Sequence, residues 1–417
     1  MRKILVPLLL VALITGLVMS GCAKPAPTPA PAPAPAPTPA PAEPVIKIGV
    51  MYPQTGPLAM TGERMVQAAK FAFKEAGYEV AGKKIEIFVE DSGGEPAVAV
   101  DKARKLVEHD KVCMIIGPLI GSTVLATGDY MSKVEIPFLT TSPSPPPTFA
   151  QPWTLVTCGS EPQHSSCIAV YTYDELGYKK INVMTNDTVQ GHGFLGAFMG
   201  AYIEKGGEVI QEQYAPFPCM DYAPYLTTLK DADALVAWYD GADAIRFLTQ
   251  VHDYGIRDRM PVVGAFHGSF FAPFILHEMP PAAADAVIGE YCETPYTALL
   301  DTPINKKFVD AYQKEYGYIP DETCSGPYEA VQIALRALGV TGGDTSPEKL
   351  RDAMLAVDFE TVGGPVRFDP ETKCRIRNVY IFQVDKRDGE YVWVPVYTYE
   401  NVPPFGFGPP PGPPPGH

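Results

Sequence analysis

Residues 45–62, VIKIGVMYPQTGPLAMTG, constrain the fold of this chain more than any other stretch. An apolar strand ends in turn residues, and helical periodicity begins immediately afterwards. This order begins a β-α unit, and it places the polar loop of Gln54, Thr55 and Gly56 at the carboxyl end of the strand. Because ligands of open α/β sheets bind at that end, we predict that this loop forms one side of a ligand cleft.

The same order of strand and helix recurs over most of the chain. Further strands are predicted over residues 84–90, 112–116, 136–140, 180–185, 208–214, 234–238, 261–264, 376–384 and 391–396. Helices are predicted over residues 65–73, 98–107, 190–205, 221–230, 242–254, 304–316 and 328–338. This alternation favours mostly parallel sheets that are covered by helices on both faces. We therefore predict an α/β fold with two doubly wound, Rossmann-like lobes.

The composition is that of a folded, acidic protein. The chain has 417 residues, of which 46% are apolar, so it can bury large cores in two or three domains. It carries 33 basic and 48 acidic residues, which gives a formal net charge of −15 at pH 7. Nucleic-acid binding needs clustered cations, and no basic patch is visible in the sequence. The composition therefore argues against nucleic acid as a partner.

The N-terminus predicts a secretory signal peptide over residues 1–21. Two basic residues precede an apolar stretch over residues 4–19, and two small residues precede Cys22. The apolar stretch is short for a membrane-spanning helix. The segment also resembles a bacterial lipobox, in which the cysteine becomes the lipidated N-terminus, although Met19 stands where leucine is usual. We expect an extracytoplasmic protein that is anchored to the membrane through lipid on Cys22.

Proline-rich segments flank the predicted folded body. Residues 22–44 contain the lipidated cysteine and a Pro/Ala tract that should be extended and semi-rigid. At about 3.1 Å per residue, this linker could hold the body roughly 60 Å from its anchor. Residues 403–417 are rich in proline and glycine, and we predict a disordered tail that does not pack.

The cysteines give no support for a metal site. If Cys22 is lipidated, seven remain, namely Cys113, Cys158, Cys167, Cys219, Cys292, Cys324 and Cys374. Some of them could pair outside the cytoplasm, and because the number is odd at least one should stay free or buried. The sequence contains no CxxC motif and no His/Cys cluster with metal-ligand spacing. We expect buried thiols with a disulfide or two, and no metal.

Several motifs follow one another in register from about residue 45 to about residue 403. They are IKIGVMYPQTGPLAMTGERMVQAAKFAFKEAG, VEDSGGEPAVAVDKARKLV, IIGPLIGS, IPFLTTSPS, GGEVIQEQY and ALVAWYDGADAIRFLTQ. In this order they resemble the leucine/isoleucine/valine-binding family of extracytoplasmic solute receptors, which serve ABC importers and have the type I periplasmic-binding-protein fold.

The resemblance implies two lobes that are joined by three hinge crossings. We place the crossings near residues 158–161, 293–296 and 366–370. The N-terminal lobe would then comprise residues 45–160 plus 296–367, and the C-terminal lobe residues 161–295 plus 368–402. Three crossings restrict the motion to a hinge, so the lobes can close on a ligand and exclude water.

The resemblance also implies a function without catalysis or a cofactor. The protein would capture a small carboxylate between its lobes, and its closed state would deliver that ligand to a membrane permease. A first alternative is the ligand-sensing domain of a signalling partner, since the same fold can present its closed state to another protein. A second, less favoured alternative is a cell-surface enzyme.

Two loops of the first lobe hold the ligand carboxylate in amino-acid-binding members of this family. By resemblance, these loops contain Gly121, Ser122 and Thr123 in one case and Ser142 and Ser144 in the other. Backbone N–H groups at a helix start, together with hydroxyls, suit an anion. Ser122 and Thr123 fit equally well as ordinary helix caps.

Two departures from the family pattern affect the expected ligand. The position that usually provides an acid for the ligand's ammonium is Phe266, followed by His267, and one hydroxyl position is Pro146. An ammonium left unpaired in an apolar pocket is costly, so an ordinary α-amino acid fits poorly. Asp240 could take over this role, but its place at a helix start also fits a simple cap.

Aromatic residues are numerous around the expected cleft. They are Tyr52, Trp238, Tyr239 and Phe266, with Phe270 and Phe271 close behind. We hypothesise a ligand with an anionic end and a flat or branched apolar body, such as an aromatic or aliphatic carboxylate. The alternative is that the phenylalanines belong to the core and that only Trp238 or Tyr239 reaches solvent.

The motif GHGFLG over residues 191–196 matches the GxGxxG pattern of dinucleotide sites. The preceding strand ends near residue 185, so the tight turn that this pattern serves is missing, and we favour close packing or ligand approach. His192 could reach the cleft from this loop. Nucleophile-elbow, zincin and P-loop motifs are absent from the sequence. The predicted ligand-binding residues are Tyr52, Gln54, Thr55, Gly121, Ser122, Thr123, Ser142, Ser144, Gln190, His192, Trp238, Tyr239, Asp240, Phe266 and His267.

Overall fold

The first lobe is built on a six-stranded sheet. A computed structural model describes residues 45–266 and 268–407 of the chain. The sheet has the order β2-β3-β1-β4-β5-β6, and β3, β1, β4, β5 and β6 run parallel. Its strands are β1 (Ile46–Tyr52), β2 (Glu79–Val80), β3 (Lys83–Asp91), β4 (Ile115–Ile116), β5 (Phe138–Thr140) and β6 (Thr154–Val156). The predicted opening strand is therefore an inner strand of a parallel sheet.

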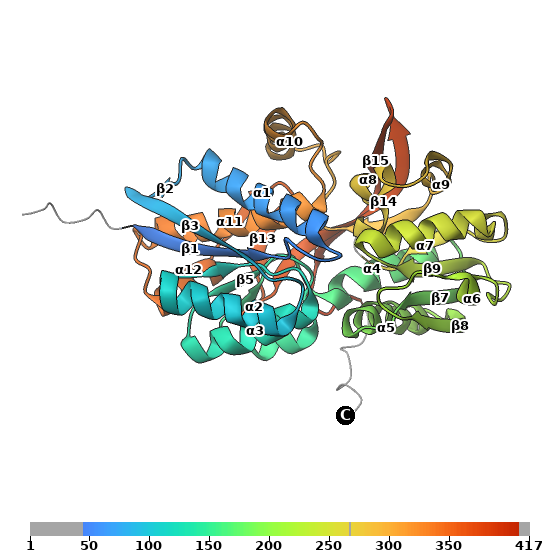
Figure 1. The fold of residues 1–417 in the computed structure, drawn as a ribbon, viewed down its shortest axis with the longest axis horizontal. Helices are drawn as coiled ribbons and strands as arrows, with labels where there is room; N and C mark the ends of the chain where they lie inside the picture. Colours follow the sequence, from blue (N-terminus) through green and yellow to red (C-terminus); the bar gives the residue numbers. More distant parts are fainter. Residues whose placement is uncertain (1–44, 267, 408–417) are drawn as a thin grey trace, which may run out of the picture. The chain divides into compact units, whose positions relative to one another are not determined.

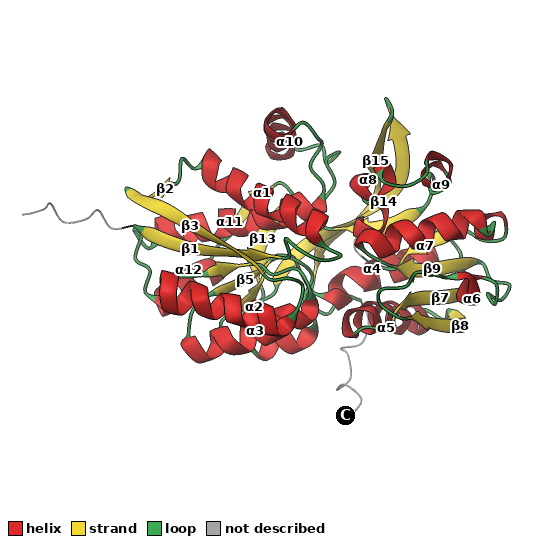
Figure 2. Cartoon of the chain, viewed as in Figure 1, coloured by secondary structure: helices red, strands yellow, loops and turns green. Residues whose placement is uncertain are grey.

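Helices cover both faces of this sheet, as Figure 2 shows. They are α1 (Ala59–Glu75), α2 (Pro96–Arg104), α3 (Gly121–Val134), α11 (Glu322–Val340) and α12 (Pro347–Leu355), with α10 (Pro303–Tyr316) packed against α1. Successive side chains of β1 point to opposite faces. Ile48 and Val50 pack against α1 and α11, whereas Met51 packs against α2 and α3. Burial on both faces explains why this strand is apolar throughout.

The second lobe contains a four-stranded parallel sheet in the order β10-β9-β7-β8. Its strands are β7 (Lys180–Asn186), β8 (Glu208–Ala215), β9 (Ala234–Trp238) and β10 (Val262–Gly264). Its helices are α4 (Glu161–Asp174), α5 (Val189–Glu204), α6 (Ala223–Leu226), α7 (Gly241–Asp253), α8 (Pro273–His277) and α9 (Pro281–Asp285). In Figure 1, α5 and α7 lie on opposite sides of β7 and β9. The predicted two-lobe α/β fold is confirmed.

A mostly antiparallel sheet connects the two cores. It has the order β11-β14-β13-β12, with β15 paired to β14. Its strands are β11 (Tyr291–Thr294), β12 (Phe359–Thr361), β13 (Gly364–Phe368), β14 (Arg375–Arg387) and β15 (Glu390–Val402). Val366 of β13 belongs to the core of the first lobe, whereas Phe382 and Val384 of β14 belong to that of the second. The chain passes between the lobes after β6, after β11 and along β13–β14.

The predicted helix over 98–107 is present as α2, which continues as a π-helical turn over Lys105–Asp110. Two other predicted elements are shorter than the sequence pattern suggested. The strand over 112–116 is reduced to β4. The helix over 221–230 is reduced to α6. There, the hydroxyls of Thr227 and Thr228 donate to Ala223 O and Pro224 O, and Lys230 N donates to Gln211 Oε1, so side chains compete for the backbone groups that a longer helix needs.

The start of the C-terminal tail packs, contrary to the prediction for residues 403–407. Pro404 is buried, and its carbonyl accepts a hydrogen bond from Ser160 Oγ. Phe407 N donates to Ser166 Oγ at 3.0 Å, and the rings of Phe405 and Phe149 meet edge to face at 5.4 Å. The tail thereby satisfies hydroxyls at the start of α4. Residues 408–417 lie outside the described residues, as do Cys22 and the linker.

The predicted disulfides are absent from the described part of the chain. All seven cysteines from Cys113 to Cys374 are free, and all except Cys113 are buried. Burial raises the pKa of the Cys113 and Cys158 thiols to about 12. These side chains act as small apolar groups, so the expectation of buried thiols holds for six of the seven and that of a disulfide does not.

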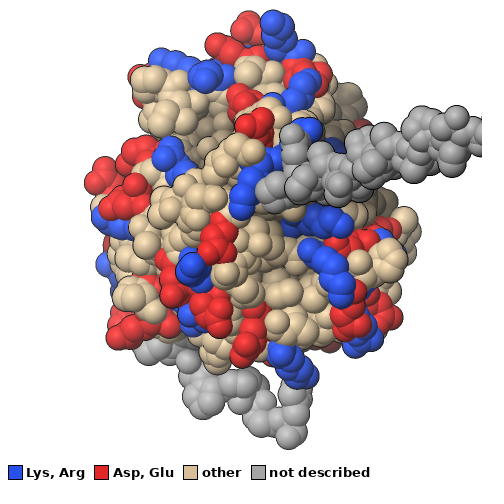
Figure 3. Space-filling view, turned by 90° about the vertical axis from the view of Figure 1, so that its left-hand side faces the viewer, with Lys and Arg blue, Asp and Glu red and all other residues tan. Residues whose placement is uncertain are grey.

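The surface agrees with the acidic, mixed composition. On the face drawn in Figure 3, acidic and basic side chains are interspersed, and no broad basic patch is visible there. Within residues 45–407, apart from residue 267, no helix is both long enough and apolar enough to cross a membrane.

A buried ionic cluster lies where β14 leaves β13. The Arg375 guanidinium contacts both oxygens of the Glu329 carboxylate, at 2.7 and 3.3 Å, and both side chains are fully buried. Arg377 donates to the carbonyls of Cys158 and Pro295, both at 2.9 Å. Through these two arginines, strand β14 connects α11 to the segments that follow β6 and β11. The ion pair and its backbone bonds hold all three crossings together.

We predict that Glu329→Gln destabilises the protein by at least about 3 kcal/mol, because it leaves the Arg375 charge buried without a counter-ion. Urea denaturation of the purified protein measures this free energy. Glu208→Gln is the matched control, since the Glu208–Lys180 pair is more than half exposed and should contribute within about 0.5 kcal/mol. Equal effects of the two substitutions would contradict the structural importance of this cluster.

Candidate ligand-binding site

The candidate site is a cavity between the two lobes. One part, of about 260 Å³, is lined from the first lobe by residues such as Leu119 and Ser122 and from the second by Gln190, Trp238 and Asp240. A smaller, deeper part of about 30 Å³ shares Leu119, Gln190, Trp238 and Asp240. The deep part adds Thr61, Met65, Thr141, Ser142, Pro143, Phe266, Glu322 and Thr323 to its lining. Both lobes therefore contribute to one continuous site.

Helix N-termini surround this cavity. Residues in the first turns of α2, α3 and α5, and the capping residues of α1 and α7, line its larger part. The start of α3 has no side-chain cap, and its capping position is Ile120. Free N–H groups and the positive ends of helix dipoles favour an anion. The geometry therefore suits a ligand with a negatively charged end.

The opening loop is held by an aspartate at the end of the neighbouring strand. Asp91 of β3 accepts hydrogen bonds from Gln54 N and Thr55 Oγ1, both at 2.7 Å. These bonds lower the pKa of Asp91 against the opposing effect of its burial. Gln54 and Thr55 are exposed and do not line the described cavity, whereas Leu58, four residues after Gln54, does. The loop reaches the second lobe at α7, where a Cβ added to Gly241 would lie 3.1 Å from Pro57 O.

Most of the predicted first-lobe hydroxyls have intramolecular partners. Tyr52 is fully buried, and its hydroxyl lies 2.8 Å from Thr141 Oγ1. Thr123 Oγ1 donates to Ile120 O within its own helix, and Ser144 Oγ donates to Thr140 Oγ1. Ser142 lines the deep cavity but donates to Leu119 O, and Gly121 starts α3 without lining the cavity. Ser122 is the predicted hydroxyl that lines the larger part of the cavity.

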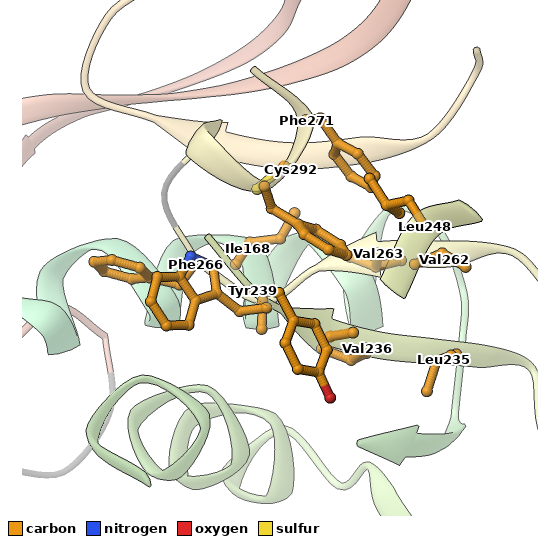
Figure 4. Close-up of a cluster of buried hydrophobic side chains, with 14 of the residues drawn as sticks. Ile168, Leu235, Val236, Tyr239, Leu248, Val262, Val263, Phe266, Phe271 and Cys292 are labelled. Atoms are coloured by element: carbon orange, nitrogen blue, oxygen red, sulfur yellow. The ribbon is translucent and has the colours of Figure 1, made fainter. Parts of the chain in front are cut away.

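The predicted aromatic residues divide between the cavity and the core. Trp238 lines both parts of the cavity, and Phe266 lines the deep part. Tyr239 packs instead against Phe247, with ring centroids 4.3 Å apart. Figure 4 shows Tyr239 and Phe271 among the buried side chains of the second lobe. The alternative that the phenylalanines belong to the core therefore holds for Phe270 and Phe271, and Tyr239 is a core residue as well.

The structure places two carboxyl groups in the cavity, one from each lobe. Asp240 caps α7, and its Oδ1 accepts from Gly241 N at 2.7 Å, which confirms the capping alternative. Glu322, in the first turn of α11, lines the deep part and was not predicted as a site residue. Burial raises the pKa of Asp240 to about 6 and that of Glu322 well above its usual range, and the nearby acids Asp321 and Asp240 raise the latter further.

Residues of the glycine motif support close packing within the second lobe. His192 stacks on Tyr214 at 3.9 Å and contacts Asp187 at 2.8 Å, without lining the cavity. A Cβ added to Gly193 would lie 2.5 Å from Glu161 Oε2, so α5 approaches the start of α4 closely. Burial raises the pKa of Glu161 well above its usual range. His267 lies outside the described residues.

Sequence reasoning missed several lining residues. Leu58, Glu95 and Leu119 come from loops that precede helices, whereas Asn186 ends β7 and Phe217 follows β8. Their positions after strands carry a signal, because the carboxyl ends of parallel strands meet at one edge. Their residue types give no such signal. Thr61 and Thr323 could be predicted only from the packing of α1 and α11 around the deep part.

Within the described residues, no group of three or more His, Cys, Asp or Glu side chains is placed to hold a metal ion. The buried His164 contacts Glu293 at 2.8 Å and Cys158 O at 3.0 Å, so both of its ring nitrogens have partners within the protein.

Comparison with known proteins establishes the family. The sequence profile of the periplasmic binding proteins matches residues 45–390, which include most of the chain. The chain belongs to the periplasmic binding protein family. A Leu/Ile/Val-binding protein homolog of Brucella melitensis is 25% identical over 367 residues, which cover 86% of this chain and 92% of that protein.

Solved structures of similar proteins share the fold of the present chain. A solute-binding protein of an ABC transporter from Rhodopseudomonas palustris, in complex with 3,4-dihydroxybenzoic acid, is 29% identical and superposes with a TM-score of 0.80. An ABC transporter substrate-binding protein from Sphaerobacter thermophilus is also 29% identical, with a TM-score of 0.79. Both alignments cover 86% of this chain and 98% of the other. A leucine-binding protein from Thermotoga maritima, at 22% identity and a TM-score of 0.76, shares the fold.

We predict opposite effects for two alanine substitutions in the glycine motif. A Cβ at Gly191 would lie 2.3 Å from Asn186 O, so Gly191→Ala must displace the cavity edge and should cost more than about 1 kcal/mol. A Cβ at Gly196 meets no described atom within 4 Å, so Gly196→Ala should stabilise the helix by up to about 1 kcal/mol. Urea denaturation measures the free energy of unfolding of each variant. If neither substitution lowered it, the close approach at Gly191 would be refuted.

The raised pKa of Asp240 predicts a pH-dependent stability. A carboxyl with a higher pKa in the folded state binds its proton more readily there, so its contribution to folding weakens as pH rises through about 4 to 6. Asp240→Asn keeps the cap and removes the buried charge, and it should therefore stabilise the ligand-free protein at pH 7.5 but not at pH 4.5. Thermal unfolding at both values checks this, with Asp231→Asn, at an exposed aspartate, as control. A pH-independent difference would contradict it.

Proposed function

We propose that this protein is the solute-binding lipoprotein of a branched-chain-amino-acid-type ABC importer and that it captures small carboxylates outside the cytoplasm. Membership of the periplasmic binding protein family supports the binding role, and the similar ABC-transporter proteins support the transport role. In this proposal Cys22 carries the lipid anchor, and a membrane permease receives the ligand. The protein itself performs no catalysis.

The observation that carries this proposal is a cavity between two lobes that is ringed by helix N-termini. Such a cavity attracts an anionic group through N–H donors and helix dipoles from both lobes. A ligand that contacts α3 of one lobe and α5 of the other stabilises their approach. Binding would therefore favour the closed state, which a permease could distinguish from the open one.

Hinge closure rests on the three passages between the lobes. We propose that the lobes comprise residues 45–160 plus 296–367 and residues 161–295 plus 368–402, as the sequence suggests. The ionic cluster of Arg375, Arg377 and Glu329 would then lie at the hinge. A buried cluster at this position would keep the crossings together while the outer parts of the lobes move.

The lining favours a carboxylate with an apolar body over an ordinary α-amino acid. By resemblance to the family, Phe266 occupies the position at which amino-acid-binding members provide an acid. Leu58, Leu119 and Trp238 give the cavity apolar walls. The 29% identical Rhodopseudomonas protein holds an aromatic acid, 3,4-dihydroxybenzoic acid. Asp240 could still serve an amino-acid ligand, so both classes belong in the test.

A thermal-shift screen of the purified protein tests this function. The panel contains leucine, 4-methylpentanoate, benzoate and hydroxybenzoates, with uncharged alcohols of the same skeletons as controls. A ligand at 100 times its dissociation constant stabilises the folded state by about 2.7 kcal/mol, which raises the melting temperature measurably. We expect at least one carboxylate to do so and its alcohol to fail. A melting temperature that no carboxylate changes would exclude the proposed function.

A further inference from the structure

Three residues that line the cavity each carry a buried polar atom with no hydrogen-bond partner within the described residues. These atoms are Thr61 Oγ1 from the first lobe, and Asn186 Oδ1 and Trp238 Nε1 from the second. All three residues are at least 94% buried. Buried polar groups in proteins are nearly always paired, so each unpaired group requires an explanation. Their convergence on one cavity indicates that a ligand supplies the partners.

Trp238 offers a donor that only an acceptor can satisfy. The indole ring is fixed by edge-to-face contacts with Phe194 at 4.7 Å and Phe266 at 6.1 Å. Its N–H is a donor without acceptor capacity. A hydrocarbon would leave this group unpaired, and an ammonium, which has donors alone, would do the same. The ligand atom at this point must accept a hydrogen bond.

Asp240 and Asn186 offer acceptors from the same lobe in the lining of the same cavity. Asp240 Oδ1 accepts from Gly241 N, which leaves further lone pairs on its carboxyl group for a ligand. Asn186 Oδ1 is an acceptor with no partner among the described residues. Asp240, Asn186 and Trp238 all line the larger part of the cavity. The ligand group that meets Trp238 must therefore be able to donate as well as to accept.

A hydroxyl group meets both requirements, because it accepts through its lone pairs and donates its proton. We infer that the ligand is a hydroxy-substituted carboxylate whose hydroxyl accepts from Trp238 Nε1 and donates to Asp240 or Asn186. This inference rests on the proposed function and narrows it. The helix N-termini bind the carboxylate, and the buried polar atoms select the hydroxyl. Thr61 Oγ1, which can donate or accept, assists from the opposite lobe.

The competing arrangement places the ligand's carboxylate, not a hydroxyl, on the Trp238 N–H. A carboxylate there would lie beside the Asp240 carboxyl group, and the two negative charges would repel each other. The two arrangements differ in one measurable respect. In the first, Trp238 distinguishes hydroxylated from parent acids, and in the second it strengthens the binding of every carboxylate equally.

Isothermal titration with matched ligands tests the inference. One series has a single skeleton with three substituents, namely 4-methylpentanoate, its 2-hydroxy derivative and leucine, which is its 2-amino derivative. The second series is benzoate, 4-hydroxybenzoate and 3,4-dihydroxybenzoate. In at least one series we expect the hydroxy acid to bind about tenfold or more tightly than the parent acid, and more tightly than leucine in the first. A parent acid or leucine that binds as tightly as its hydroxy counterpart would overturn the inference.

Variants then assign the preference to its residues. Trp238→Phe keeps a ring but removes the N–H, and it should reduce the ratio of hydroxy to parent affinity towards one while parent affinity changes less than about threefold. Thr61→Val should reduce the ratio by a smaller factor. Thr127→Val is the matched control, because Thr127 is also buried with an unpaired hydroxyl but does not line the cavity. Thermal unfolding of each variant verifies that it is folded.

Three results would count against the inference in distinguishable ways. An equal loss of affinity for hydroxylated and parent acids in Trp238→Phe would show that the N–H binds the carboxylate. An unchanged ratio in both Trp238→Phe and Thr61→Val would show that these atoms do not contact the substituent. If no carboxylate binds to the wild-type protein, the proposed function fails, and the inference fails with it.

Discussion

The direction of parallel strands is the constraint on which the whole site depends. Every helix that follows a parallel strand starts at the carboxyl edge of its sheet, so α2, α3, α5 and α7 begin at the carboxyl edges of their two sheets. Where these edges meet at the cavity, N–H groups and positive dipole ends from both lobes converge on one volume. Attraction of an anion is thus a property of the topology, and no lysine or arginine is needed among the residues that line the cavity.

Polar groups inside the cavity oppose the attraction of an anion by the helix N-termini. They thereby restrict which anions fit the cavity. Asp240 neutralises the start of α7, and Glu322 places a second carboxyl at the opposite wall. Burial makes both carboxyls easier to protonate than they are in water. Trp238, in contrast, carries a donor that has no partner among the described residues. A ligand that satisfies all these groups must carry a negative charge at one end and must both donate and accept hydrogen bonds elsewhere. Few small molecules meet both requirements.

Much of the fold could be predicted because local patterns and tertiary structure agree. The apolar run of β1 is buried on both faces, and the strands β7 and β9 and the helices α5 and α7 occur within a residue or two of their predicted positions. The prediction failed where side chains compete for backbone groups, as in the short helix α6, and where the tail at Pro404 finds a partner in Ser160. Such partners are distant in sequence and have no local signal.

The sequence by itself determined the α/β class and the two lobes, and it predicted a ligand site at the carboxyl ends of the strands, since periodicity and strand direction are local properties. Gln190, Trp238 and Asp240 could be predicted for the same reason. Only the tertiary structure decided that Tyr239 faces the core while Trp238 faces the cavity, because adjacent strand residues point to opposite sides and the packing of α7 selects the side. It also decided the contributions of Thr61, Asn186 and Glu322, whose positions depend on how α1, β7 and α11 meet in space.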